Sequence, residues 1–223
     1  MKTRYFTSET LDEKAKAMKD DLAPLLRDRA TFIPANSALL ILDMQRYFLD
    51  AGSHAHIPSA EAILPRVDAL RAATMDAGLP VVWTRHLNTP ANAGSMSRWW
   101  GDLIDAENPL SEIHPALDTS SGLVIEKTQY DAFYQTNLAE YLRDHNVEQV
   151  VIAGVMTHLC CETTARSAFV QGFEVFFLID GTATYNEEYH RATLLNLAHG
   201  FATPVLSEEI LLTLKTQSAQ RFS

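Results

Sequence analysis

The sequence contains few cysteines, and it has no long apolar run. Its only two cysteines, Cys160 and Cys161, are adjacent, so they make neither a practical disulfide nor a metal cage. No apolar stretch approaches the roughly 18 residues that a membrane-spanning helix needs. The residues after Met1 are polar, unlike the apolar core of a signal peptide. These absences lead us to expect a protein of a reduced, cytoplasmic compartment.

Basic residues are also scarce. The chain has 18 Lys and Arg against 28 Asp and Glu, a formal net charge of -10, and its basic residues form no cluster. This balance argues against nucleic acid or an anionic membrane surface as a partner. No linker rich in Pro, Gly or Ser divides the chain, so we expect one main domain over residues 37–223, preceded by a helical arm over residues 1–36.

Short apolar runs alternate with segments of helical periodicity along the whole chain. The pattern predicts strands at residues 37–43, 79–84, 122–127, 150–152, 174–180 and 202–206. Helices are predicted at residues 8–29, 57–76, 130–145, 161–171 and 189–199, with residues 44–56 as a loop. Six mostly parallel strands alternating with helices predict a doubly wound, three-layer α/β/α fold of the Rossmann-like kind.

Three reactive side chains fall at the ends of predicted strands. Asp43 follows the first predicted strand, and Lys127 ends the third strand. Cys160 and Cys161 lie between the fourth strand and the helix that follows it. Because the carboxyl ends of parallel strands share one edge of the sheet, we expect these groups to converge there. A helix amino terminus favours a thiolate, so we also expect a lowered cysteine pKa. Together these groups are suited to nucleophilic catalysis.

Three segments resemble, in order and spacing, the isochorismatase-like cysteine hydrolases. They are residues 42–48 (LDMQRYF), 126–133 (EKTQYDAF) and 154–166 (GVMTHLCCETTAR). The resemblance implies a triad of Asp43, Lys127 and Cys160, with Cys160 as the nucleophile and Cys161 in the core. It also implies a cis peptide between Val155 and Met156, and an oxyanion hole formed by the N–H groups of Met156 and Cys160.

The implied reaction is hydrolysis of a C–N bond, in an amide or carbamoyl group of a small substrate, through a covalent thioester and without a cofactor. Two alternatives remain open. True isochorismatases of the family cleave a vinyl ether without needing the thiol, and a family member can also bind a small molecule without catalysis.

A zinc site of the nicotinamidase kind is not expected. Nicotinamidases of the superfamily carry an Asp four residues after the catalytic Asp and an Asp-x-His after the second strand. Those places hold Tyr47 and the segment Thr84-Arg85-His86 here. The loop histidines His54, His56 and His86 are also candidates for a metal or a substrate pocket, although scattered loop histidines are usually solvated.

The irregular segment 85–122 follows a strand, where specificity loops commonly lie. Candidate substrate contacts are therefore aromatic or polar residues in or near this segment, together with others beside the catalytic acid. They are Gln45, Phe48, Arg85, His86, Trp99, Trp100 and Tyr130. Gln45 is equally suited to a structural hydrogen bond, Arg85 to the surface, and the two tryptophans to a subunit contact. The resemblance implies a homo-oligomer, a dimer or a tetramer.

Overall fold

The computed structural model describes residues 1–26 and 30–221, and its centre is a six-stranded sheet. All neighbouring strands are parallel, in the order β3-β2-β1-β4-β5-β6, as the doubly wound prediction requires. The strands are β1 (Ser37–Leu42), β2 (Val81–His86), β3 (Leu123–Lys127), β4 (Gln149–Val155), β5 (Glu174–Ala183) and β6 (Thr203–Val205). β1 and β4 are buried along their whole length, as expected for central parallel strands.

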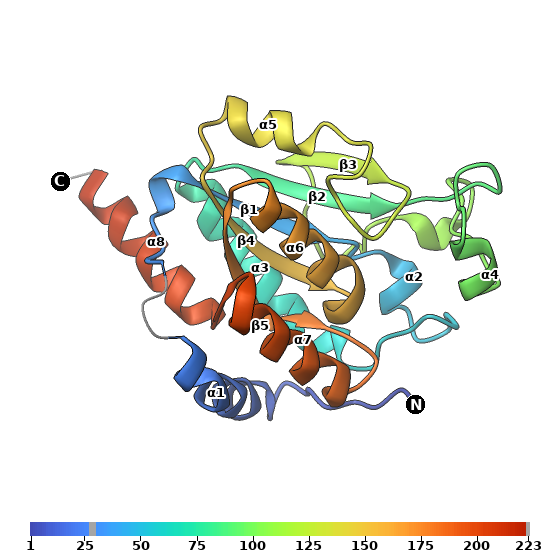
Figure 1. The fold of residues 1–223 in the computed structure, drawn as a ribbon, viewed down its shortest axis with the longest axis horizontal. Coiled ribbons are helices and arrows are strands. Elements are labelled where there is room, and N and C mark those ends of the chain that lie inside the picture. Colours follow the sequence, from blue (N-terminus) through green and yellow to red (C-terminus); the bar gives the residue numbers. More distant parts are fainter. Residues whose placement is uncertain (27–29, 222–223) are drawn as a thin grey trace.

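Helices cover both faces of the sheet. In Figure 1, α6 (Glu162–Val170) and α7 (Glu187–Gly200) lie in front of it and α3 (Ala60–Asp76) lies behind. The C-terminal α8 (Ser207–Arg221) packs against α3, and α1 (Leu11–Leu22) packs against β5 and α7. The remaining helices are α2 (Arg46–Leu49), α4 (Met96–Trp100) and α5 (Leu138–Asp144). Within the described residues, no helix is long and apolar enough to cross a membrane.

Two predicted helices are much shorter in the structure, by more than one turn. The helix predicted at residues 8–29 ends at Leu22 and passes into a 3₁₀ turn containing Pro24, while residues 27–29 lie outside the described part. The helix predicted at residues 130–145 begins only at Leu138. The side-chain oxygen of Thr164 accepts a hydrogen bond from the Ala132 N–H, so contacts with α6 hold this segment out of helical geometry. The sequence patterns did not predict α2, α4 or α8.

The winding of the sheet reverses between β1 and β4. The chain moves from β1 outward to β2 and β3, then crosses back to β4 and moves outward to β5 and β6. The connections diverge above the carboxyl ends of β1 and β4, where open α/β sheets leave a crevice. The two strands approach each other closely at Gly154, where a Cβ atom would lie 2.1 Å from the Leu42 carbonyl oxygen. Only glycine fits this close approach, and glycine also adopts the positive φ of 111° found there.

The N-terminal segment is tied to the interior near this crevice. The Tyr5 hydroxyl lies 2.9 Å from Nδ1 of His190 and accepts a hydrogen bond from the Thr184 N–H. The Thr157 hydroxyl lies 3.3 Å from the same His190 nitrogen. Residues early in the chain therefore share the core with the turn that follows β4. The division into an arm at residues 1–36 and a domain at residues 37–223 stays a prediction.

His190 should make stability depend on pH. Burial lowers its pKa to about 3, so the folded protein resists protonation that the unfolded chain accepts below about pH 6.5. Stability is therefore fully present above that pH and is lost as pH falls. Between about pH 7.5 and 5 we expect His190 to cost about 2 kcal/mol of unfolding free energy. Urea titrations at both pH values measure this loss.

The variant His190→Gln should flatten the pH dependence by about that amount. His199→Gln, at an exposed position near the end of the same helix, is the matched control and should leave the dependence as it is. Equal slopes for the wild type and His190→Gln would contradict the prediction.

Candidate active site

Asp43 is held in place by the neighbouring strand β2. It follows β1 directly and adopts φ 51°, a left-handed conformation that is uncommon outside glycine. Its N–H donates to the Thr84 carbonyl, and the Thr84 hydroxyl donates to Asp43 Oδ1 at 2.6 Å. The carboxylate is completely buried. Thr84 thus fixes one oxygen of the carboxylate and leaves Oδ2 for another partner.

That partner is Lys127, at the end of β3. Its Nζ lies 2.7 Å from Asp43 Oδ2, and both side chains are fully shielded from solvent. The same ammonium donates to the Gln129 carbonyl at 2.9 Å. Because two buried charges must be paired to be tolerated, Asp43 and Lys127 form a single electrostatic unit.

Cys160 lies on the turn that follows β4. The Val155–Met156 peptide is cis, as the family resemblance implies. A short π-helix, Thr157–Cys161, comes next, and its backbone turns around the Met156 carbonyl, which accepts from the N–H groups of Leu159 and Cys161. Sγ of Cys160 lies 3.5 Å from Lys127 Nζ. The structure thus brings Asp43, Lys127 and Cys160 together from three different strand ends.

The expected lowering of the cysteine pKa is not found. Burial raises the pKa of the Cys160 thiol, and the negative charge of Asp43 adds to this, while Lys127 opposes it. Burial also acts to raise the pKa of Asp43, but Lys127 and the other neighbours outweigh it and hold that pKa below its usual range. The resting site therefore holds a neutral thiol beside an ionised carboxylate, which is the state that general-base activation requires.

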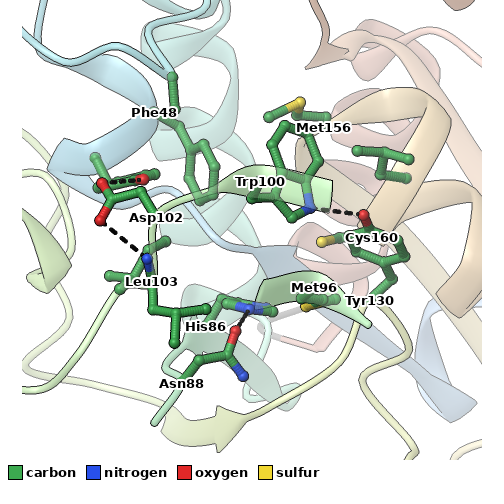
Figure 2. A pocket seen from close by; sticks show the side chains of 14 residues that line it. Phe48, His86, Asn88, Met96, Trp100, Asp102, Leu103, Tyr130, Met156 and Cys160 are labelled. Carbon is green, nitrogen blue, oxygen red and sulfur yellow. Dashed lines mark hydrogen bonds between the residues drawn. The ribbon is translucent and has the colours of Figure 1, made fainter. Parts of the chain in front are cut away.

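Cys160 is one of the residues that line a pocket, drawn in Figure 2, whose empty space of about 500 Å³ includes open solvent. Its walls are mostly aromatic and aliphatic, and Asp102 is the one charged residue among them. The lining residues are Tyr47, Phe48, Ala55, His86, Asn88, Met96, Trp100, Asp102, Leu103, Ile104, Tyr130, Met156, Leu159 and Cys160. The Trp100 indole N–H donates to the Tyr130 hydroxyl at 2.8 Å, which fixes one wall. Such a mostly apolar lining suits a small, uncharged molecule.

Four of the predicted substrate contacts, Phe48, His86, Trp100 and Tyr130, line this pocket. Three others lie outside it. Gln45 is fully buried, and its amide makes hydrogen bonds to the backbone of His86 and Ser111.

Arg85 also serves a structural purpose instead of facing the pocket. Its guanidinium donates to Ser111 and pairs with Glu112, which ties the loop to β2. Trp99 is 82 % exposed and lines a neighbouring hollow together with Trp100 and Tyr130. The loop histidines His54 and His56 do not line the pocket either.

Several lining residues were not predicted individually. Asn88, Met96, Asp102, Leu103 and Ile104 all come from the irregular segment after β2, which the sequence marked only as a specificity region. Asp102 accepts a hydrogen bond from the Tyr47 hydroxyl at 3.0 Å, so this segment is anchored to α2. No periodic pattern distinguishes such residues, because their positions depend on tertiary contacts.

Comparison with known proteins identifies the family. The family model for the isochorismatase domain matches residues 37–209. The chain belongs to the isochorismatase family. It is 43 % identical to nicotinamidase 3 of Arabidopsis thaliana over 171 residues, which are 74 % of this chain and 82 % of that protein. It is 31 % identical to the isochorismatase of Bacillus subtilis strain 168 over 184 residues, 80 % of this chain and 58 % of that protein.

A cysteine hydrolase from Pseudomonas syringae pv. phaseolicola 1448A shares the fold, with a TM-score of 0.78 at 22 % identity, covering 84 % of this chain and 96 % of that one. The matches together make this protein a hydrolase of the isochorismatase family.

The zinc site of nicotinamidases does not fit this isochorismatase-family hydrolase. By the family resemblance, Tyr47 and Thr84 stand in the places of nicotinamidase carboxylates, and both hydroxyls donate to other carboxylates. His86 uses Nε2 for Asn88 and directs Nδ1 at Lys127. Potential ligand atoms of Asp43, His86 and Cys160 do lie within 4.8 Å of one another. Lys127 contacts all three groups, and a dication there would be repelled by the ammonium.

Replacing Lys127 should destabilise the protein strongly. Lys127→Met leaves the Asp43 charge buried without its partner, which should cost about 3 to 5 kcal/mol of unfolding free energy. The double variant Asp43→Asn/Lys127→Met should recover most of this loss. Lys14→Met is the matched control, since Lys14 and Glu187 are also 2.7 Å apart but partly exposed, and should cost less than about 1 kcal/mol. Urea unfolding measures the free energy of unfolding of all three variants. If the losses from the two single substitutions simply added in the double variant, Asp43 and Lys127 would not be a coupled buried pair.

Chelators should not affect catalysis. Because the donor set does not fit zinc, prolonged treatment with a strong chelator should leave kcat/KM unchanged, and elemental analysis should find far less than one zinc per chain. Loss of activity on chelation, with recovery on adding zinc alone, would show that the hydrolase does use a metal.

Proposed function

We propose that this protein is a cysteine amidase that hydrolyses the C–N bond of a small, flat and uncharged carboxamide. The observation that carries the proposal is the position of the Cys160 thiol in the lining of a mostly apolar pocket, 3.5 Å from the ammonium that pairs with Asp43. Similarity to a nicotinamidase supports an aromatic carboxamide of the nicotinamide type.

The first half of the reaction forms a thioester. Asp43 takes the proton of the Cys160 thiol, and the sulfur attacks the carboxamide carbon. By family resemblance, the N–H groups of Met156 and Cys160 stabilise the resulting oxyanion. Protonated Asp43 then gives its proton to the leaving nitrogen, the C–N bond breaks, and ammonia departs. Throughout, Lys127 stays charged and stabilises whichever of Asp43 and Cys160 carries the negative charge.

The second half releases the acid. A water molecule takes the place of ammonia, Asp43 removes its proton, and the resulting hydroxide attacks the thioester carbon. The C–S bond breaks, and the sulfur recovers a proton from Asp43. The carboxylic acid leaves, and the resting thiol and carboxylate are restored.

The charge of the pocket argues against vinyl-ether cleavage. Isochorismate is a dicarboxylate, and binding it would call for cationic side chains in the pocket wall. Within the described residues, the pocket is lined by no Lys or Arg and includes the acid Asp102. A neutral carboxamide avoids this electrostatic conflict, and the intact trio of reactive groups favours catalysis over simple binding.

Ammonia release tests the proposal. We expect the wild type to release ammonia from nicotinamide or a related aromatic carboxamide. Cys160→Ala should lower kcat by at least about a thousandfold, since it removes the nucleophile. Cys161→Ala changes the adjacent buried thiol, which the mechanism does not use, and should retain most activity as the matched control.

Trapping and a substrate comparison complete the test. Mass spectrometry of a rapidly quenched reaction should find the acyl group on the peptide that contains Cys160. Full turnover by Cys160→Ala would contradict the thiol mechanism. Release of pyruvate from isochorismate by that variant would instead favour the vinyl-ether reaction.

A further inference from the structure

The ammonium of Lys127 has more neighbours than hydrogens. It carries three N–H bonds. Its closest partners are Asp43 Oδ2, ion-paired with it at 2.7 Å, and the Gln129 carbonyl, which accepts a hydrogen bond at 2.9 Å. Two further atoms lie at nearly equal, longer distances, Nδ1 of His86 at 3.4 Å and Sγ of Cys160 at 3.5 Å. These two atoms compete for the third hydrogen.

Asn88 decides which nitrogen of His86 carries a proton. The Asn88 amide nitrogen donates to the Thr128 carbonyl at 2.8 Å, and since a carbonyl only accepts, this contact fixes the orientation of the amide. The amide oxygen Oδ1 then faces Nε2 of His86 at 2.6 Å, as Figure 2 shows. An amide oxygen is also only an acceptor, so Nε2 must be the protonated nitrogen.

The other nitrogen, Nδ1, therefore offers a lone pair to Lys127. Burial lowers the pKa of His86 to about 4, with a further contribution from Lys127 that Asp43 opposes, so the ring is neutral at physiological pH. Gln45 fixes the ring's attachment, because its side chain accepts from the His86 N–H and donates to the His86 carbonyl. The contact of the His86 ring with Asn88 and the contacts of its backbone with Gln45 thus hold the Nδ1 lone pair toward the Lys127 ammonium.

We propose that His86 is a positioning residue which, as the Nε2–H tautomer set by Asn88, accepts the third N–H of Lys127 at rest and yields it to Cys160 when the thiolate forms. The proton of the thiol goes to Asp43, and Lys127 keeps all three of its hydrogens, so only the acceptor of one hydrogen bond changes. The nearly equal distances mean that the ammonium needs little movement. The inference rests on the proposed function for the role of Cys160 as nucleophile.

The tautomer can be observed without any substrate. Nitrogen NMR of protein labelled with ¹⁵N-histidine distinguishes protonated from bare imidazole nitrogens, and the spectrum of His86→Gln identifies the signals of His86. At about pH 7 we expect a proton on Nε2 and a bare Nδ1. A proton on Nδ1, or a doubly protonated ring, would overturn the proposal.

The variant Asn88→Asp tests the consequence for catalysis. A carboxylate facing Nε2 raises the pKa of His86, so the ring becomes an imidazolium whose Nδ1–H points at Lys127 and repels it. The charged or ionisable groups facing His86 are Lys127, Asp43 and Cys160, and all stay in place. The acidic limb of the pH profile should therefore move upward by about one to three pH units.

Two readouts separate positioning from substrate binding. The first is the rate at which iodoacetamide alkylates Cys160, followed by mass spectrometry against pH, and the second is kcat for ammonia release. Both profiles should shift in Asn88→Asp. Ala91→Asp is the control, because it adds the same charge to the same loop at an exposed position and should leave both profiles unchanged.

The possible outcomes distinguish failure of the positioning role from failure of the proposed amidase function. Coincident alkylation profiles for the wild type and Asn88→Asp, or equal shifts for both loop variants, would overturn the positioning role. A shifted alkylation profile together with the Nε2–H tautomer, but without hydrolysis of any carboxamide, would support the role of His86 and reject the proposed amidase function.

Discussion

The site depends on one buried ion pair. Lys127 and Asp43 are 2.7 Å apart and without solvent contact, so neither charge is tolerable without the other. The pair also decides the protonation of the site, because the ammonium keeps the carboxylate ionised while burial keeps the neighbouring thiol neutral. A base and its proton donor thus lie in contact before substrate arrives, and the ammonium stabilises the negative charge on either of them.

The surrounding fold holds the Asp43–Lys127 pair close to the sulfur of Cys160. β2 separates the strands that carry Asp43 and Lys127, and Thr84 on that strand binds the carboxylate, while β4 approaches β1 closely enough at Gly154 to place the Cys160 turn above them. Polar side chains around the ion pair likewise hold a neighbouring residue in place. Gln45 binds the backbone of His86 and Asn88 binds its ring, which faces Lys127. A few precisely placed polar groups within mostly apolar walls are typical of small-molecule sites.

The family comparison identifies the general class of reaction, whereas the residues of the pocket bear on the particular substrate. Membership of the isochorismatase family establishes a hydrolase, but the family includes both amide and vinyl-ether chemistry. Our proposal of amide chemistry rests on local features, namely a cysteine at the reactive position and a pocket wall that contains an acid instead of a base. By the family resemblance, Tyr47 and Thr84 replace carboxylates of nicotinamidases, and their hydroxyls donate to Asp102 and Asp43 instead of offering carboxylate oxygens to zinc.

The sequence alone determined the alternation of strands and helices, the parallel sheet, and the three strand ends that carry Asp43, Lys127 and Cys160. Those features depend on local periodicity and on the geometry shared by all parallel sheets. Only the tertiary structure decided that Gln45 and Arg85 hold backbone, that Trp99 faces solvent, and that Asn88 and Asp102 reach the pocket. It also reversed the expected direction of the Cys160 pKa, because the cost of burying a charge depends on everything packed around it, and no local pattern records that packing.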